Sequence, residues 1–244
     1  MESRATDSDA GNNPSGTVRY SQQDKDIGEA KNFSWEHPVP RNAFWDDLPY
    51  TVARNFLNAF TTEELSVIPI DPDSTESKEE KLRFLSTWLD KKMAEQEAPS
   101  SVHNVSWEPL MIGLVSVRWE LGDLGGAEEI ARLMVERRKD GNPQYLHQLA
   151  GILLDRGQYA EAESTERKVQ PWLIEKLGKD SPQALSATRI IVLSMWKQGV
   201  SRHAEARKLI DELQDIVNGM AIGKYTVYQD EERELLKELM GRMD

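Results

Sequence analysis

Apolar residues recur at the spacing of an α-helix along most of the chain after residue 41. Two stripes in the N-terminal part show this spacing, namely Val52, Phe56 and Phe60, then Leu82, Leu85 and Leu89. Residues three or four positions apart lie on one face of a helix, so each stripe predicts one amphipathic helix. The alternation of β-branched and polar residues that is typical of strands is missing from the sequence. The pattern therefore predicts an all-α fold.

Capping residues and prolines set the boundaries of the predicted helices. Asp47 is expected to cap a helix whose first turn holds Pro49, and Ser77 with Glu80 forms a capping-box pattern. Residues 41–100 are therefore predicted to be a helical N-terminal segment. Residues 1–40 are rich in Ser, Asp, Asn, Gly and Gln, and we expect a disordered N-terminal arm there.

One short pattern occurs three times in the C-terminal half. Each copy has an apolar helix, a glycine, and an alanine five residues after that glycine. The glycines are Gly122, Gly157 and Gly199, and the alanines are Ala127, Ala162 and Ala204. Glycine ends a helix easily because it adopts the left-handed conformation without a Cβ clash. The small alanine then lets a second helix cross closely over the first.

Each copy is thus predicted to be a helical hairpin with one apolar side left over, and hairpins of this kind must stack to bury that side. In the middle copy, Pro143 opens the first helix, and Pro182 opens the matching helix of the next copy. After the last copy, Tyr225, Tyr228, Leu235, Leu236 and Leu239 lie on one side of a charged segment. We expect residues 224–244 to be a C-terminal capping helix.

The hairpin pattern resembles the tetratricopeptide repeat (TPR), whose period is 34 residues. The stretch from Gly157 to Thr188 is similar to the longer repeat of kinesin light chains, with Ser181 in place of the usual histidine. The resemblance covers about residues 108–217. It implies a right-handed superhelical stack of antiparallel helix pairs over residues 107–218, a TPR-like α-solenoid with flanking helices.

The resemblance also implies where a partner would bind, because the first helices of such repeats line a concave groove. The matching positions, counted back from the three glycines, are Ile112, Ser116, Trp119 and Glu120, then His147 and Asp155, then Arg189, Trp196 and Lys197.

Two features of these positions bear on the partner. Trp119 and Trp196 both stand three residues before their glycines, and tryptophan is enriched at binding hot spots. Each tryptophan faces either the groove or an adjacent flanking helix. The charges change from acidic Glu120 and Asp155 to basic residues further on. A peptide with a basic end, an acidic end and an apolar or aromatic middle would complement this order.

Composition narrows the class of protein. The 244 residues include no cysteine and carry a net charge of −12. The absence of cysteine excludes disulfides, thiol catalysis and cysteine-bound metals. The negative net charge disfavours binding to nucleic acid. The sequence shows no signal sequence and no membrane-spanning apolar run. We expect an intracellular protein that binds no membrane, in the cytoplasm or alternatively in the nucleus.

Catalytic and cofactor motifs are not recognisable. No two of the four histidines are spaced four apart as in a zinc helix, and Gly219–Tyr225 lacks the spacing and the hydroxyl of a phosphate loop. We expect no metal, no cofactor and no catalytic residues. The sequence favours a protein–protein interaction module, an adaptor or assembly subunit that binds a peptide or helix. The alternatives are a small helical enzyme or accessory protein with the repeats as scaffold, and a self-assembling homo-oligomer.

Overall fold

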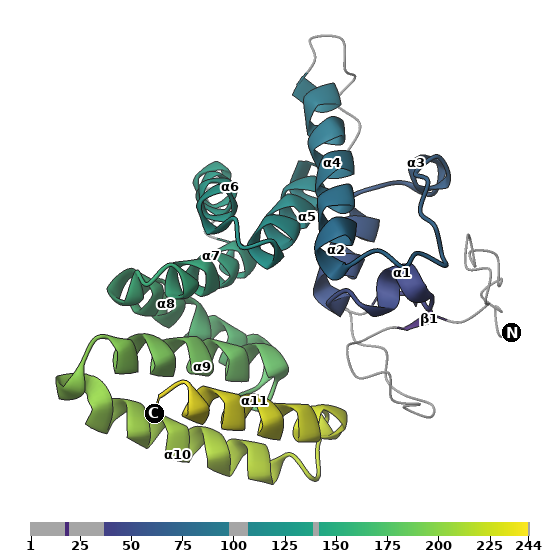
Figure 1. Ribbon diagram of the computed structural model, residues 1–244. Helices are drawn as coiled ribbons and strands as arrows, with labels where there is room; N and C mark the ends of the chain where they lie inside the picture. Colours follow the sequence, from purple (N-terminus) through teal and green to yellow (C-terminus); the bar gives the residue numbers. More distant parts are fainter. Residues whose placement is uncertain (1–17, 20–36, 98–106, 139–141, 244) are drawn as a thin grey trace, which may run out of the picture. The chain divides into compact units, whose positions relative to one another are not determined.

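The fold is known from a computed structural model that describes residues 18–19, 37–97, 107–138 and 142–243 (Figure 1). Regular structure within these ranges is helical, apart from two antiparallel strands of two residues each, β1 (Val18–Arg19) and β2 (Val39–Pro40). The all-α prediction is confirmed. Most of the predicted disordered arm, residues 1–40, lies outside the described residues, as do residues 98–100 of the predicted helical N-terminal segment.

The chain divides into two compact units, Met1–Asp123 and Leu124–Asp244. The division falls inside the segment predicted to hold the repeats, between the two helices of its first pair. The two units are therefore described separately.

Five helices are found among the described residues of the first unit. They are α1 (Ala43–Asp46), α2 (Tyr50–Asn58), α3 (Thr62–Ser66), α4 (Lys78–Glu97) and α5 (Trp107–Glu120). Helix α5 packs against both α2 and α4. The predicted leucine stripe of α4 is buried, and the Ser77–Glu80 capping box is formed, with the Ser77 amide donating to Glu80 over 2.8 Å.

Two buried lysines of α4 tie it to the preceding segments. The Lys81 ammonium donates to Asp47 over 2.6 Å, and Lys92 donates to the Ala59 carbonyl over 2.7 Å. The prediction that Asp47 caps the following helix was wrong, because its carboxylate is engaged by Lys81 at the end of α1. Helix α2 begins at Tyr50, with Pro49 at the N-cap and no side-chain cap. A buried ammonium needs a carboxylate or carbonyl partner, which outweighs the gain from one exposed cap.

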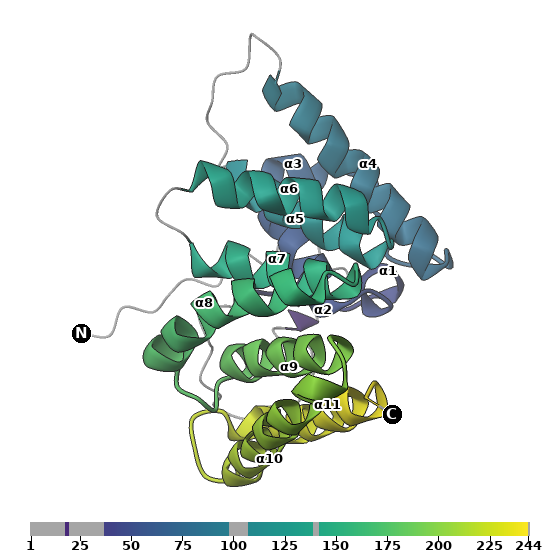
Figure 2. The same ribbon diagram turned by 90° about the vertical axis from the view of Figure 1, so that its left-hand side faces the viewer.

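The second unit is a succession of helices. They are α6 (Leu124–Arg137), α7 (Pro143–Asp155), α8 (Tyr159–Leu177), α9 (Pro182–Lys197), α10 (His203–Gly219) and α11 (Gln229–Gly241), with 3₁₀ turns η1 (Val200–Arg202) and η2 (Thr226–Tyr228). Helix α8 packs on α7 and α9, and α7 also contacts α9. Figure 2 shows α7, α8 and α9 following one another, with α10 and α11 beyond α9. Helix α11 contacts both α9 and α10.

The three predicted glycine turns are present. Gly122, Gly157 and Gly199 have φ angles of 79°, 77° and 119°, the left-handed region where a Cβ would be strained. The predicted alanine is buried at the fourth position of α6 and of α8. In the third copy the prediction was wrong: Ala204 is exposed and Ala206 is buried. Turn η1 adds two residues after Gly199, so the fourth position of α10 is residue 206.

The C-terminal segment buries the apolar side that the sequence predicts. Tyr225, Tyr228, Leu236 and Leu239 are buried and Leu235 is half-buried. The Tyr225 hydroxyl donates to the Leu177 carbonyl at the end of α8 over 2.9 Å. The Gln229 amide donates to the Val217 carbonyl at the end of α10 over 2.8 Å. These two bonds fix where α11 starts.

The close crossing of α5 over α2 generates a first prediction. A Cβ at Gly113 would lie 3.1 Å from the Leu89 side chain and 3.3 Å from the Asn55 carbonyl oxygen. Gly113→Val should therefore lower the free energy of unfolding by about 1–3 kcal/mol through overpacking. The matched control is Gly219→Val, because a Cβ there meets nothing within 4 Å. Thermal and urea unfolding of both variants would measure the difference, and equal stability of the two would contradict it.

Candidate protein-binding surface

The nine predicted groove residues are divided between the two units. Four of them lie on α5 in the first unit, and five lie on α7 and α9 in the second. The structure thus brings together His147, Asp155, Arg189, Trp196 and Lys197 on two helices that contact one another. The four residues of α5 form a separate set.

On α5, the polar residues of the set are engaged within the first unit. The Ser116 hydroxyl accepts a hydrogen bond of 2.6 Å from the Asn55 amide on α2, and Glu120 pairs with Lys78 on α4. Ile112 and Trp119 are half-buried. Ser116 therefore helps to hold α5 against α2, a role that its spacing alone did not indicate.

On α7, both predicted residues have acidic or basic partners. The His147 ring lies 2.8 Å from Glu166 of α8, a carboxylate that is fully buried. The second oxygen of Glu166 has no hydrogen-bond partner among the described residues. Asp155 lies 3.6 Å from Arg242, directly after α11. The carboxyl end of α7 is thus linked to the carboxyl end of α11.

On α9, two of the three predicted residues contact other helices. Arg189 pairs with Glu232 of α11. The Trp196 ring stacks on His203 of α10, with a centroid distance of 3.5 Å and an interplanar angle of 7°, and the Arg207 guanidinium lies 5.3 Å from its centroid. Trp196, for which the sequence left both the groove and a flanking helix open, thus packs on the second helix of its own pair. Lys197 is exposed.

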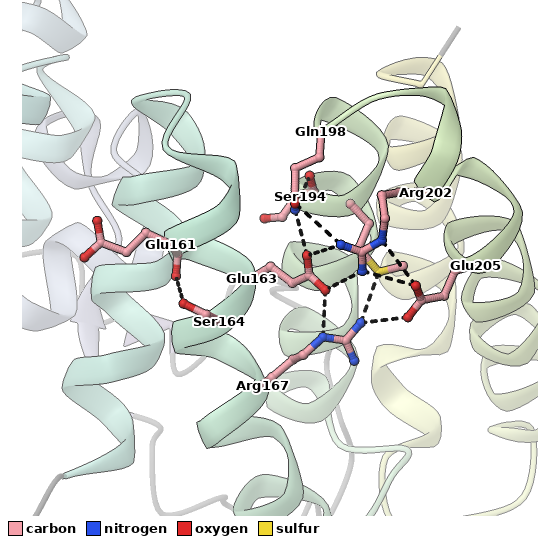
Figure 3. Close-up of polar contacts among 9 residues, drawn as sticks. Glu161, Glu163, Ser164, Arg167, Ser194, Gln198, Arg202 and Glu205 are labelled. Atoms are coloured by element: carbon pink, nitrogen blue, oxygen red, sulfur yellow. Dashed lines mark hydrogen bonds and ion pairs between the residues drawn. The ribbon is translucent and has the colours of Figure 1, made fainter.

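The sequence reasoning missed a pair of buried carboxylates that join consecutive helix pairs. Glu163, the fifth residue of α8, is the first (Figure 3). It accepts hydrogen bonds from Arg167 over 2.8 Å, from Gln198 over 2.7 Å and from Arg202 over 2.8 Å. Arg167 and Arg202 also both reach Glu205 over 3.1 Å. One carboxylate thereby connects α8 with the end of α9 and the start of α10.

Glu128, the fifth residue of α6, occupies the same position one copy earlier. It accepts from Arg132 over 2.7 Å, from Arg156 and from Gln158 over 3.3 Å, and Arg132 reaches Glu161 over 2.8 Å. We call these two networks the carboxylate clamps, centred on Glu128 and on Glu163. In each, one donor precedes the next glycine and another precedes the next second helix. In the Glu128 clamp these two donors are Arg156 and Gln158, and in the Glu163 clamp they are Gln198 and Arg202.

A sequence signal for the clamps exists. A glutamate stands six residues, and an arginine ten residues, after Gly122 and after Gly157. The spacing alone does not indicate a buried clamp, because glutamate and arginine four residues apart are common on exposed helix faces. Here the glutamates are buried, at 7% relative exposure each.

The clamp donors keep both glutamates ionised. Burial by itself would raise the pKa of Glu163, but hydrogen bonds from Arg202, Gln198 and Arg167 outweigh it and lower that pKa below its ordinary value. Burial would also raise the pKa of Glu128, but Arg132 and Arg156 outweigh it and lower that pKa below its ordinary value. Both clamps are therefore charged at neutral pH.

The described residues offer no sign of metal or membrane chemistry. They contain no group of three or more metal-ligating side chains. None of the helices in the described ranges is long and apolar enough to cross a bilayer. The predicted residues on α7 and α9 have charged or aromatic side chains.

Comparison with known proteins adds nothing to this description, because no family model, no curated protein and no solved structure matches the chain.

Removing one clamp charge should destabilise the second unit. In Glu128→Gln the buried position keeps its size, but Arg132 and Arg156 lose their anionic acceptor. We expect the free energy of unfolding at pH 7 to fall by about 1–3 kcal/mol. The control is Glu129→Gln, the exposed neighbour on the same helix, which should change stability little. Urea unfolding would measure both, and equal stability would contradict the role given to Glu128.

The clamp at Glu163 should also give a defined dependence on pH. Because its folded pKa is lowered, the stability it contributes is present above the unfolded value of about 4.3 and is lost as pH falls through the folded value. The stability difference between the wild type and Glu163→Gln should therefore shrink as pH falls below about 5. Unfolding curves of both proteins between pH 7 and pH 3 would measure it. A difference that is constant over this range would exclude an ionised clamp.

Proposed function

We propose that the chain is a protein–protein interaction module, an adaptor or assembly subunit, whose second unit binds a peptide or helix on the surface of α7 and α9. In this proposal residues 107–218 are TPR-like repeats in a right-handed superhelical stack, and residues 224–244 cap it. The acidic, cysteine-free composition fits a partner that is protein, not nucleic acid, in the cytoplasm or the nucleus.

The observation that carries the proposal is the recurrence of the carboxylate clamp at equivalent positions of consecutive helix pairs. Each clamp takes one arginine from its own helix and one arginine and one glutamine from the ends of the next two helices. Helices α6, α7 and α8 are therefore joined in a similar manner to α8, α9 and α10. Units joined in one repeated manner form an extended array, in which each repeat contacts mainly its neighbours. Arrays of this kind present a continuous surface instead of a closed chamber.

The order of helix contacts gives further support. The first helices α7 and α9 contact one another, and α11 contacts α9 and α10. Side chains on these first helices include the exposed Lys197 and the half-exposed His147 and Trp196. A mixture of charge and aromatic area on adjoining helices is what a peptide-binding surface needs.

Charge reversal at Lys197 tests this function. Lys197→Glu alters the exposed surface of α9, and we expect it to weaken binding of a partner captured from the native source by about five-fold or more. Lys208→Glu, with the same charge change on exposed α10, is the control and should leave binding unchanged. Quantitative capture with the wild type and both variants would measure it.

Two outcomes would contradict the function. Equal binding by all three proteins would mean that the partner binds to another surface. Thermal stabilisation by small metabolites, together with no captured protein, would instead favour an enzyme. Sedimentation of the purified chain would reveal the third class, a self-assembling oligomer.

A further inference from the structure

Helix α11 meets the surface of α7 and α9 through both of its ends. Glu232 in its first turn pairs with Arg189 of α9, and Arg242 directly after its last turn lies 3.6 Å from Asp155 of α7. Arg189 and Asp155 are two of the residues that the sequence assigns to the groove. The chain thus supplies its own segment with an acidic start and a basic end.

The contact that holds α11 is polar for its size. Within this helix the buried apolar side chains are Leu236 and Leu239, Leu235 is half-buried, and Met240 is 46% exposed. Its remaining buried residues are Gln229 and Glu232, both polar. A buried ion pair adds little net stability, because removing both charges from water costs about as much as their attraction returns. Few apolar contacts mark a segment that opens readily.

The charge on Glu232 adds to this weakness. Burial raises the pKa of Glu232 above its ordinary value, and the hydrogen bond from Arg189 does not fully compensate. The charged groups that face this carboxylate are Arg189 from α9 and Glu231 from α11 itself. Burial therefore disfavours the charged form of Glu232 in the docked helix.

We propose that α11 occupies in cis the surface that receives the partner, and that the partner is an amphipathic helix of the same design. Such a helix has a carboxylate that pairs with Arg189, leucines four and seven positions later, and a basic residue ten positions later that pairs with Asp155. Over ten residues a helix rises about 15 Å, so one ligand helix spans both sites. This inference rests on the proposed function and adds the chemistry of the ligand.

A peptide competition experiment tests the inference. A fluorescent peptide of residues 224–243 is titrated onto the full-length protein. In the Glu232→Arg protein the cis helix is repelled by Arg189, so the free fraction of the surface rises and the peptide should bind about tenfold more tightly than to the wild type. Glu238→Arg is the control, because Glu238 is exposed on the same helix. It should bind the peptide as weakly as the wild type.

A charge swap separates competition from general loosening. In the double variant Arg189→Glu with Glu232→Arg the cis pair is restored with reversed sign, and the wild-type peptide should again bind weakly. The single Arg189→Glu protein should instead bind a peptide that carries Glu232→Arg. Only a ligand that contacts residue 189 directly should change its binding when the charges at positions 189 and 232 are both reversed.

Several results would overturn the inference. One is a folded Glu232→Arg protein that binds the peptide no better than the wild type. Another is cooperative unfolding of the second unit in both Glu232→Arg and the milder Glu232→Gln, which would make α11 a permanent cap. A captured partner that is sensitive to Lys197→Glu but is not displaced by the peptide would overturn this inference and leave the proposed function standing.

Discussion

The second unit depends on a carboxylate buried at each junction between helix pairs. Glu128 and Glu163 are charged, nearly inaccessible to water and surrounded by donors from three successive helices. An isolated buried carboxylate is costly, but three or four charge-assisted hydrogen bonds offset that cost and make its geometry specific. Because the donors come from the next pair, each junction fixes how α6 or α8 is oriented on the pair that follows it. Hydrophobic burial alone would leave that orientation loosely determined.

Repetition of the junction explains why a two-residue insertion is tolerated in the third copy. The clamp donor Arg202 comes from the residue before α10, just as Gln158 precedes α8. Turn η1 moves the start of α10 by two positions, yet Arg202, Glu205 and Ala206 keep their places relative to that start. The constraint acts on positions within the helix and not on the distance from the glycine. That is why counting from Gly199 assigned the alanine wrongly.

Much of the fold could be predicted from the sequence, because glycine turns, proline starts and apolar spacing are local signals. The left-handed glycines and the buried stripes followed from residue type and spacing alone. The surface could be predicted only in part, since side-chain partners depend on helices distant in sequence. Ser116 is held by Asn55, sixty-one residues earlier, and Trp196 is drawn onto His203. Counting residues back from a glycine cannot predict those contacts.

Helix α10 shows why the clamp does not occur a third time. At the fifth and ninth positions of α10, where α6 and α8 have glutamate and arginine, the chain has Arg207 and Asp211. A further helix pair built like the others would bring its own arginine to Arg207, and two cations cannot share a buried site. Arg207 lies instead over the Trp196 ring, a contact that needs no carboxylate. The reversed charges therefore stop the clamp after two copies and leave α9 and α10 to be covered by α11, a helix of different design.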